Sequence, residues 1–600
     1  MERVADYIIR TVKDAGAKHI FMITGRGILY LTDAVAKEKG IVAVSPYHEQ
    51  SASYAAMAYS SITNAASACL VSTGCAAANA ITAVLCAYQD NLPVVFISGN
   101  HMLKETTRYT QAPIRTYGSQ EADIINLVKP ITKYAAMLTC GEDAVYEVEK
   151  ALYLAGEGRK GPVWIDVPLD VQNMRIETGR MEHFQIPCRD VKKRREVLKE
   201  EAKTVASELS CAQRPVILIG GGIACADAGG EIKMLVERGN LPLTFSPGVC
   251  DVYGTSHDLS IGSVGSLGGT RAGNFAVQNA DYILAVGTKL CSQETGRKDA
   301  FARAAKITVV DIDEKEHQKD GVHIERFIHA DAKEFLEELL KQNIAVSSSR
   351  WADTCRHWKS VFAIGHEKFV QELKENDRLD IYSVMDMVSP CLPQEATVIT
   401  DAGFEELIVP SCLRFGDGQR CLFPASQGAM GYALPAVIGA YFAGRKQIIV
   451  FVGDGSFMMN MQELEIIRDK NIPVRIVVIS NYMYAVIRKR QKDLFRTRTI
   501  GNDPTDGVPA PDFRKIAECF GFAYKKIHSR SELEKCKDQL LSGDEGREII
   551  EILCTPDQNY LHESYAVNEK KRLVHRPIED MSPFLDREVM RREMIIDMVE

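Results

Sequence analysis

The chain has 600 residues, of which 46% are hydrophobic and 25% are charged, and its formal net charge is -8. This length exceeds what a single hydrophobic core supports, so several domains are expected. The mildly acidic balance excludes a polycationic surface for nucleic acid or anionic membranes. Small molecules are therefore the expected partners.

The cysteines and the apolar runs favour a cytoplasmic protein. The sixteen cysteines stand singly, without a CxxC pair or a Cys/His cluster at zinc spacing, so we expect reduced thiols. The N-terminal stretch interleaves charged and apolar residues, which is not typical of a secretion signal. Apolar runs end after six to eight residues, well short of the roughly twenty that a membrane-spanning helix needs.

Three successive blocks of the chain alternate short, β-branched apolar runs with amphipathic helical stretches. This alternation predicts an α/β fold of three domains, each with a doubly wound parallel sheet. We expect the domains at 1–175, 195–345 and 365–555, followed by a charged, irregular tail over 556–600. The predicted strands cover 19–23, 41–46, 67–73, 92–99 and 162–168, then 214–223, 241–248, 280–290 and 305–316, then 396–403, 421–426, 447–456, 472–481 and 548–554.

Polar side chains follow two successive strands of the third block. One strand runs into Gly453-Asp454-Gly455-Ser456, a helix follows, and the next strand ends at Asn481. Because the carboxyl ends of parallel strands meet at one edge of a sheet, where anionic ligands bind, these side chains are expected to lie together. Glycines there let the backbone approach a phosphate without a Cβ clash.

The same segment offers a set of oxygen ligands that suits magnesium. Asp454 and Asn481 supply side-chain oxygens and Met483 a carbonyl oxygen, to which phosphate oxygens would add. The alternative is that Asp-Gly is a strand-to-helix turn and Asn481 a helix cap. The spacing across two strands favours a magnesium-diphosphate site.

This pattern resembles thiamine-diphosphate enzymes, which carry GDG followed about 25 residues later by a pair of asparagines. Ser480 replaces the first of that pair, whereas Asn481 retains the second, which binds the metal in the family. The resemblance implies thiamine diphosphate and Mg²⁺ as cofactors. It also implies that the first, second and third domains are pyrimidine-binding, central and diphosphate-binding.

Two further segments resemble cofactor-binding motifs of this family. PYHEQ resembles the RHEQ segment, whose glutamate, here Glu49, bonds the aminopyrimidine ring and promotes removal of the thiazolium proton. A lone glutamate there would otherwise serve as a helix N-terminal charge. The segment GAMGYA resembles the one that cradles the aminopyrimidine, with Gly428 and Met430 in contact with the ring; the alternative for Met430 is a core filler.

Over about 550 residues the chain resembles acetolactate synthase and its relatives, with all three blocks in the same order. The resemblance implies decarboxylating acyl transfer from a 2-keto acid, with pyruvate as the expected donor, and it places Gln120 beside the thiazolium ring. It also implies a homodimer or homotetramer with active sites at the subunit interface. The alternatives are a simple 2-keto acid decarboxylase or C–C hydrolase/lyase, and a non-catalytic relative that kept the fold.

Departures from acetolactate synthase concern the substrate pocket. Gly25-Arg26 brings a positive charge into a loop that carries two glycines in the family, although a loop arginine can simply be solvated. Arg490 stands where acetolactate synthases have a tryptophan that shapes the acceptor site. With Tyr484 and Ile487 on the same helix, these residues favour a polar or anionic acceptor such as a ketosugar over 2-ketobutyrate.

Glycines of the second block leave FAD binding open. Cys225 stands where a GxGxxG pattern starting at Gly220 needs its third glycine, so an NAD site is not expected. Lys289 and Cys291-Ser292 replace an arginine and an acidic pair of the FAD-binding acetolactate synthases. Four glycines nevertheless resemble the FAD-binding region of those enzymes: Gly262, Gly265, Gly268 and Gly269.

Overall fold

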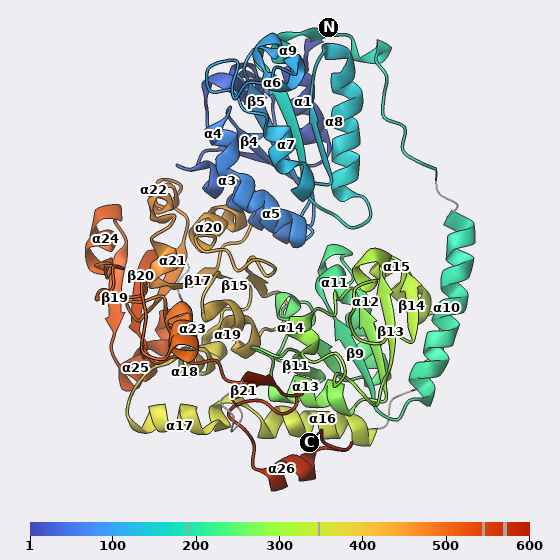
Figure 1. The fold of residues 1–600 in the computed structure, drawn as a ribbon, viewed down its shortest axis with the longest axis vertical. Coiled ribbons are helices and arrows are strands. Elements are labelled where there is room, and N and C mark those ends of the chain that lie inside the picture. The colour runs from blue at the N-terminus through green and yellow to red at the C-terminus, as the bar shows by residue number, and fades with distance from the viewer. Residues whose placement is uncertain (189–190, 346–348, 543–545, 568–572, 600) are drawn as a thin grey trace. The chain divides into compact units, whose positions relative to one another are not determined.

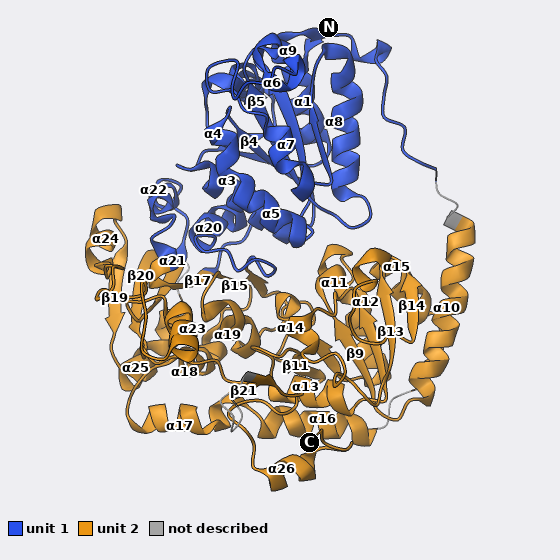
Figure 2. Ribbon diagram, in the orientation of Figure 1, with its two compact units in different colours: residues 1–189, 424–448, 456–474 blue, residues 190–423, 449–455, 475–600 orange. Residues whose placement is uncertain are grey.

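The structure is a computed structural model that describes residues 1–188, 191–345, 349–542, 546–567 and 573–599. Its contacts divide the chain into two compact units, both discontinuous in sequence (Figure 2). Residues 1–189, 424–448 and 456–474 form the first unit, and residues 190–423, 449–455 and 475–600 form the second. Across the described ranges, every helix is too short or too polar to cross a membrane.

The first unit is built on a sheet of six parallel strands in the order β3-β2-β4-β5-β7-β6 (Figure 1). Its central strands are buried along their whole length, and the rings of Phe96 and Trp164 stack within it at 5.3 Å. The strands are β2 (His19–Met22), β3 (Val42–Val44), β4 (Ser67–Val71), β5 (Val94–Asn100), β6 (Tyr134–Met137) and β7 (Val163–Pro168). The longer helices around it are α1 (Val4–Asp14), α2 (Leu29–Lys37), α3 (Glu49–Thr63), α5 (Ile81–Gln89) and α8 (Gly141–Gly156).

One helix of the first unit comes from far along the chain. Helix α20 (Ala433–Phe442) packs along α3, and the two lie side by side in Figure 1. A Cβ on Gly439 would lie 2.1 Å from the carbonyl oxygen of Ala55, so only glycine permits this approach. Small residues in both helices therefore join the two segments whose motifs resemble cofactor-binding elements.

The second unit contains a six-stranded parallel sheet in the order β11-β10-β9-β12-β13-β14. This is the order of doubly wound dinucleotide-binding sheets. In β9, Ile217 and Ile219 face one core and Val216 and Leu218 the other, so the apolar run is buried on both faces. The strands are β9 (Pro215–Ile219), β10 (Leu243–Phe245), β11 (Ser260–Ser263), β12 (Tyr282–Val286), β13 (Lys306–Asp311) and β14 (Arg326–His329). The helices that flank it are α10 (Val191–Cys211), α11 (Gly221–Cys225), α12 (Gly229–Gly239), α13 (Arg271–Asn279), α15 (Ala332–Leu340) and α16 (Ser349–Val361).

A third six-stranded sheet, in the order β16-β15-β17-β18-β20-β19, lies almost entirely in the second unit. Its strands are β15 (Thr397–Thr400), β16 (Arg420–Leu422), β17 (Ile448–Gly453), β18 (Val474–Ser480), β19 (Ala523–Ile527) and β20 (Arg547–Leu553). Among its helices are α18 (Ile381–Val388), α19 (Glu405–Cys412), α21 (Asp454–Phe457), α22 (Leu464–Asp469), α23 (Ala485–Phe495), α24 (Phe513–Phe520) and α25 (Arg530–Leu540). The three sheets confirm the predicted α/β fold of doubly wound parallel sheets.

Of the strands in the three six-stranded sheets, the sequence missed four, and all four lie at sheet edges: β6, β11, β14 and β19. An edge strand pairs on one side only and is covered less, so it does not need a continuous apolar run. In β19, four of the five residues are exposed or only partly buried, which is why AYKKI was not recognised. The domain boundaries remain a prediction, because the compact units do not follow the sheets one to one.

The segment after residue 556 covers other parts of the second unit. It contains the short strands β21 (Tyr565–Val567) and β22 (Leu573–His575) and the helix α26 (Arg587–Glu593). Asn274 on α13 donates to the carbonyl oxygen of Ile578 at 3.0 Å. Arg303 forms an ion pair of 2.8 Å with the buried Glu579. These contacts join the segment to elements around the sheet of β9 to β14, here called the central sheet.

Candidate active site

The carboxyl edge of the third sheet brings Asp454 and Asn481 together. Gly453 at the end of β17 pairs with Ile479 near the end of β18, so the residues that follow the two strands are neighbours. The Asp454 carboxylate accepts hydrogen bonds from the backbone N–H groups of Asn481, at 3.0 Å, and Tyr482, at 2.5 Å, both through Oδ2. The backbone N–H of Gly455 also interacts with this carboxylate and, like the other two, lowers its pKa.

Burial and unsatisfied polar atoms distinguish this edge. Asp454 is 4% exposed, and burial raises the pKa of its carboxyl to about 6. Burial also raises the pKa of Glu405, at the start of α19, to about 8. The hydroxyls of Thr400 and Ser480, which end β15 and β18, are buried without a hydrogen-bond partner in the part of the chain that the structure describes. A cation and a polar ligand would compensate such groups.

The turn after β18 carries the other two predicted metal ligands. Asn481 Oδ1 accepts from the backbone N–H of Met483 at 3.2 Å, so the amide folds back over its own turn. No group of three or more His, Cys, Asp or Glu in the described ranges could hold a metal. One carboxylate, one amide and one carbonyl would therefore need phosphate oxygens to complete an octahedral magnesium site. The donor set fits a magnesium-diphosphate ligand rather than a bare ion.

Gly455 serves a purpose that the sequence did not reveal. A Cβ on Gly455 would lie 2.1 Å from Cε1 of the Tyr484 ring, whereas at Gly453 the nearest atom, Glu405 Oε1, is 3.4 Å away. The Tyr484 ring, in the turn after β18, therefore occupies the space beside Gly455. Tyr484 was predicted as a substrate-side residue, and the structure places it against the GDG segment.

Glu49 is the first residue of α3, as the sequence predicted, after the edge strand β3. The His48 side chain caps the helix by accepting from the backbone N–H of Gln50 at 3.1 Å. Glu49 is partly buried, and its Oε2 accepts from Asn79 Nδ2 at 2.9 Å. Asn79 ends α4 (Cys75–Asn79), so a second helix fixes one oxygen of this carboxylate.

Gln120 lies in a loop that is held tightly although its own side chain is exposed. Its φ is 66°, and its carbonyl oxygen lies 2.2 Å from where a Cβ on Gly74 would be. The neighbouring Glu121 accepts from the backbone N–H groups of Thr107 and Tyr117, at 3.1 and 3.2 Å. Only a glycine at position 74 allows the loop to approach this closely.

A buried polar network lies beneath that loop. Asn100 donates to the carbonyl oxygen of Ala122 at 3.3 Å and to Asp166 Oδ2 at 2.8 Å, and Ser98 donates to Asp166 Oδ1 at 2.6 Å. Asp166 is 1% exposed, and burial raises its pKa to about 7 against the lowering effect of both hydrogen bonds. The network fixes the segment that follows Gln120.

The raised pKa of Asp166 predicts how the free energy of unfolding depends on pH. Its pKa is about 7 in the folded chain and near the ordinary 3.8 in the unfolded chain, so the folded state binds the proton more tightly. Its stabilising contribution is fully present below about pH 4 and is lost as the pH rises through 7, a difference on the order of 4 kcal/mol. The Asp166→Asn variant should show a smaller fall of melting temperature between pH 5 and pH 8 than the wild type. Equal falls would contradict this assignment.

The Gly25-Arg26 loop sits above the neighbouring strand ends of the first sheet. A Cβ on Gly25 would lie 2.3 Å from the hydroxyl oxygen of Ser72, just beyond β4. The carbonyl oxygen of Gly27 accepts from Gln172 Nε2 at 2.6 Å. Arg26 itself is exposed. Gly25, Arg26 and Glu49 thus follow the carboxyl ends of strands of this sheet, and the loop of Gln120 approaches Gly74, which follows β4.

The turn that carries Gly428 and Met430 is joined to the Glu49 helix by a residue that the sequence did not single out. Gly431 donates its backbone N–H to Ser456 Oγ at 2.8 Å, so the Ser456 hydroxyl holds the turn. Asn460 Nδ2 donates to the carbonyl oxygen of Gly431 at 2.8 Å, and Asn460 Oδ1 accepts from the Ser51 hydroxyl at 3.1 Å. Asn460 has no motif around it, and only its position shortly after GDGS could have drawn attention to it.

Three of the basic side chains of helix α23 lie near carboxylates. Arg488 pairs with Asp503 at 3.1 Å and Lys489 with Asp493 at 2.7 Å. Arg490 lies 3.9 Å from Glu563, and its side chain is 41% exposed. Ile487 is 52% exposed on the same helix. Of the predicted substrate residues, Tyr484, Ile487 and Arg490 share one turn and helix of the second unit.

The glycines of the central sheet do not fit a flavin diphosphate. Gly222 donates its backbone N–H to the carbonyl oxygen of Gly287 at 2.8 Å, so the loop after β12 occupies the N-terminus of α11. A Cβ on Gly268 would lie 2.8 Å from Leu407, and one on Gly269 2.5 Å from Gly265. Other parts of the protein make the close approaches that these glycines permit.

A buried carboxylate occupies the same edge of the central sheet. Glu294 is 8% exposed and accepts hydrogen bonds from the Thr288 hydroxyl, at 3.1 Å, and the Cys291 backbone N–H, at 3.1 Å. The Ser246 hydroxyl, after β10, also donates to it. The Glu294 side chain therefore already engages the donors that follow β10 and β12 at this edge.

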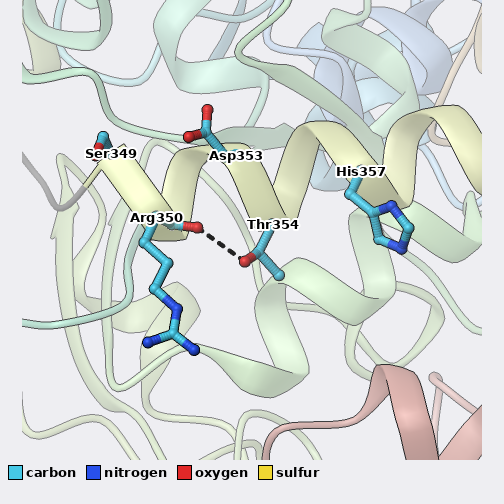
Figure 3. A pocket seen from close by; sticks show the side chains of 5 residues that line it. All are labelled: Ser349, Arg350, Asp353, Thr354 and His357. Atoms are coloured by element: carbon cyan, nitrogen blue, oxygen red, sulfur yellow. Dashed lines mark hydrogen bonds between the residues drawn. The ribbon is translucent and has the colours of Figure 1, made fainter.

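A surface pocket is lined by five residues, none of which is a predicted site residue (Figure 3). It runs along the first turns of α16, and the Thr354 hydroxyl bonds the carbonyl oxygen of Arg350 at 2.8 Å within the helix. Its lining consists of Ser349, Arg350, Asp353, Thr354 and His357. The pocket shows no convergence of buried polar groups, so it is not the candidate active site.

Comparison with known proteins assigns the family. The N-terminal TPP binding domain of thiamine pyrophosphate enzymes matches residues 2–126, their central domain residues 202–339, and their C-terminal TPP binding domain residues 401–552. Together these matches cover more than half of the chain. Each match contains one of the three sheets in part or in full.

Individual relatives carry the name acetolactate synthase. The large subunit from Lactococcus lactis subsp. lactis is 27% identical over 556 residues, covering 92% of this chain and 93% of that protein. The large subunit from Haemophilus influenzae is 28% identical over 531 residues, with 88% and 90% covered. Acetolactate synthase 1, chloroplastic, from Oryza sativa subsp. japonica is 27% identical over 572 residues, with 93% and 85% covered. The chain therefore belongs to the thiamine pyrophosphate enzyme family and resembles the acetolactate synthase large subunit.

Proposed function

We propose that the chain transfers an acyl unit from a 2-keto acid, with pyruvate as the expected donor, to a carbonyl acceptor after loss of carbon dioxide. The observation that carries the proposal is the turn in which Asp454 bonds the backbone of Asn481 and Tyr482 at the carboxyl edge of the third sheet. Relatives named acetolactate synthase over most of the chain support the same reaction class.

Thiamine diphosphate and Mg²⁺ are the proposed cofactors. Asp454, Asn481 and the Met483 carbonyl would hold the metal, and the GDGS backbone would lie against the diphosphate. When bound, thiamine diphosphate serves as the electron sink for carbon dioxide loss from the keto acid. A carboxylate buried as deeply as Asp454 is costly to keep charged, and a bound cation would offset part of that cost.

Glu49 is the proposed proton-transfer residue. Its Oε2 is already fixed by Asn79, and the other oxygen, Oε1, would exchange a proton with the aminopyrimidine nitrogen of a bound cofactor. Gln120, on its clamped loop, and Met430, on the turn held by Ser456 and Asn460, would orient the ligand. The residue contacts that support these roles lie within the first unit.

The acceptor is proposed to be polar, with a ketosugar as the leading class. The paired charges of α23 favour a neutral, hydroxyl-rich molecule over a strongly anionic one, because Arg488, Lys489 and Arg490 each face a carboxylate. Arg26 is exposed, and its guanidinium would suit an acceptor that carries a carboxylate group.

A screen of products tests this proposal against its alternatives. Purified protein with thiamine diphosphate and Mg²⁺ is incubated with individual 2-keto acids, alone and with carbonyl acceptors including ketosugars, and products are identified by mass spectrometry. Acyl transfer predicts a product that combines donor and acceptor masses less carbon dioxide. An aldehyde as the sole product would instead indicate a simple decarboxylase, and cleavage of a diketone a C–C hydrolase or lyase.

The enzyme is proposed to work without FAD. The glycine contacts and the Glu294 carboxylate described above occupy the edge of the central sheet where a flavin diphosphate would bind. Protein purified after expression with riboflavin should show no absorbance band near 450 nm after release into denaturant, whereas a flavoprotein treated in parallel should. A stoichiometric flavin band would overturn this prediction.

The assembly and the compartment remain proposals. We infer a homodimer or homotetramer with active sites at the subunit interface, as in the family, and a cytoplasmic location from the scattered cysteines. Sedimentation velocity would detect a monomer, which would contradict the shared-site arrangement.

A further inference from the structure

Tyr482 stands between the two predicted metal ligands Asn481 and Met483 and adopts a backbone conformation that few side chains favour. Its φ is 56°, in the left-handed region. A residue with a bulky side chain in this region costs about 1–2 kcal/mol unless other contacts offset the strain. Its backbone N–H is one of the two that donate to Asp454. The conformation of this residue therefore sets the geometry of the whole turn.

The Tyr482 side chain is anchored on the strands that continue the sheet beyond β18. Its hydroxyl donates to Glu551 Oε1 on β20 at 2.7 Å and accepts from Lys526 Nζ on β19 at 2.9 Å. Lys526 also lies 3.1 Å from Glu551 and 5.6 Å from the centre of the Tyr482 ring. Lys526 and Glu551 are cross-strand partners in the register of these strands. The anchor is thus part of the sheet itself.

The carboxylate at the centre of the anchor is kept ionised. Glu551 is 2% exposed, and burial alone would raise its pKa. Hydrogen bonds from Tyr524 and Tyr482 and the charge of Lys526 outweigh burial and lower that pKa. Tyr524 donates to the second oxygen, Oε2, at 2.5 Å. Two tyrosines thus bond the same carboxylate, and only Tyr482 belongs to the turn.

We propose that Tyr482, Glu551 and Lys526 form a clamp that holds the Asn481–Met483 turn in its Mg²⁺-binding conformation, with Tyr482 as a positioning residue. None of the three clamp residues is one of the predicted oxygen ligands. It acts by keeping Asn481 and the Met483 carbonyl beside Asp454. The inference rests on the proposed magnesium-diphosphate site and adds to it the residues that determine how tightly that site binds its metal.

The test compares two tyrosine-to-phenylalanine variants that each remove one hydrogen bond to Glu551. In Tyr482→Phe the anchor of the turn is lost, while in Tyr524→Phe only the outer hydrogen bond is lost. Binding of thiamine diphosphate is followed by calorimetry as Mg²⁺ is titrated, for wild type and both variants. The Mg²⁺ concentration for half-maximal binding should rise about tenfold in Tyr482→Phe and less than about twofold in Tyr524→Phe.

Two further readouts separate a positioning role from general destabilisation. Thermal unfolding without ligands should be alike in the two variants, and excess Mg²⁺ should restore full cofactor binding to Tyr482→Phe. Equal Mg²⁺ requirements in wild type and Tyr482→Phe, or equal shifts in both variants, would overturn the clamp. Failure of the wild type itself to bind thiamine diphosphate with Mg²⁺ would instead overturn the proposed function, and the clamp with it.

Discussion

Replacement of Glu49 by glutamine is expected to lower the rate of proton exchange at the reactive carbon of bound thiamine diphosphate about a thousandfold. Glutamine keeps the size of the side chain and can still accept from Asn79, but it cannot take up and return a proton. The cofactor should therefore bind with nearly unchanged affinity. Exchange in deuterium oxide, quenched in acid and read by proton NMR, measures the rate directly, and carbon dioxide release should fall in parallel.

A matched control addresses the other reading of Glu49, that of a helix N-terminal charge. Glu142 also lies in the first turn of a helix of the same unit, α8, and is exposed. Glu142→Gln removes the same charge from a helix N-terminus, which is worth about 0.3–1 kcal/mol, and should leave proton exchange unchanged. Similar exchange rates in Glu49→Gln and wild type would show that Glu49 serves only the helix.

Replacement of Asp454 by alanine is expected to weaken Mg²⁺-dependent binding of thiamine diphosphate by about a hundredfold or more. Loss of one partner of a buried charged contact costs about 2–5 kcal/mol. The variant also loses the acceptor that holds the backbone N–H groups of Asn481 and Tyr482, so the metal site loses a ligand and its turn loses an anchor. Calorimetry with and without Mg²⁺ measures the change.

Asp454→Asn separates these two losses. The asparagine oxygen can still accept from the turn, but the residue no longer carries the negative charge that attracts the metal. We expect wild-type stability with strongly impaired Mg²⁺ dependence. If Asp454→Asn bound thiamine diphosphate and Mg²⁺ as the wild type does, the carboxylate would not be the metal ligand, and Asp-Gly would be merely a strand-to-helix turn.

Most of the strands that could be predicted from the sequence are those that the fold buries on both faces. IIVFVG and PVRIVVIS became β17 and β18 because a parallel strand between two layers of helices needs a continuous apolar run. Four of the six edge strands were missed, whereas the edge strands β3 and β16 were predicted. The adjacency of Asp454 and Asn481 followed from the same rule, since it depends only on which strands are neighbours and where they end.

The supporting residues could not be predicted, because they depend on what packs where. Asn460, Tyr482 and Glu294 belong to no motif. Their roles come from partners elsewhere in the chain, 409 residues away for Asn460 with Ser51, 69 for Tyr482 with Glu551 and 6 for Glu294 with Thr288. The glycines show the same limit. Sequence indicates that a backbone comes close to something at Gly455 and Gly268, and the protein neighbours there are the side chains of Tyr484 and Leu407, which no motif identifies.

The most direct test of the proposed decarboxylating acyl transfer is carbon dioxide release from 2-keto acids by the purified wild-type protein, measured with carboxyl-labelled substrates. Carbon dioxide release should require both thiamine diphosphate and Mg²⁺, and it should rise when a suitable polar carbonyl acceptor is added. Thiamine diphosphate that binds with Mg²⁺ but supports no release from any 2-keto acid would contradict the proposed acyl transfer, and would leave a cofactor-binding protein without decarboxylase chemistry.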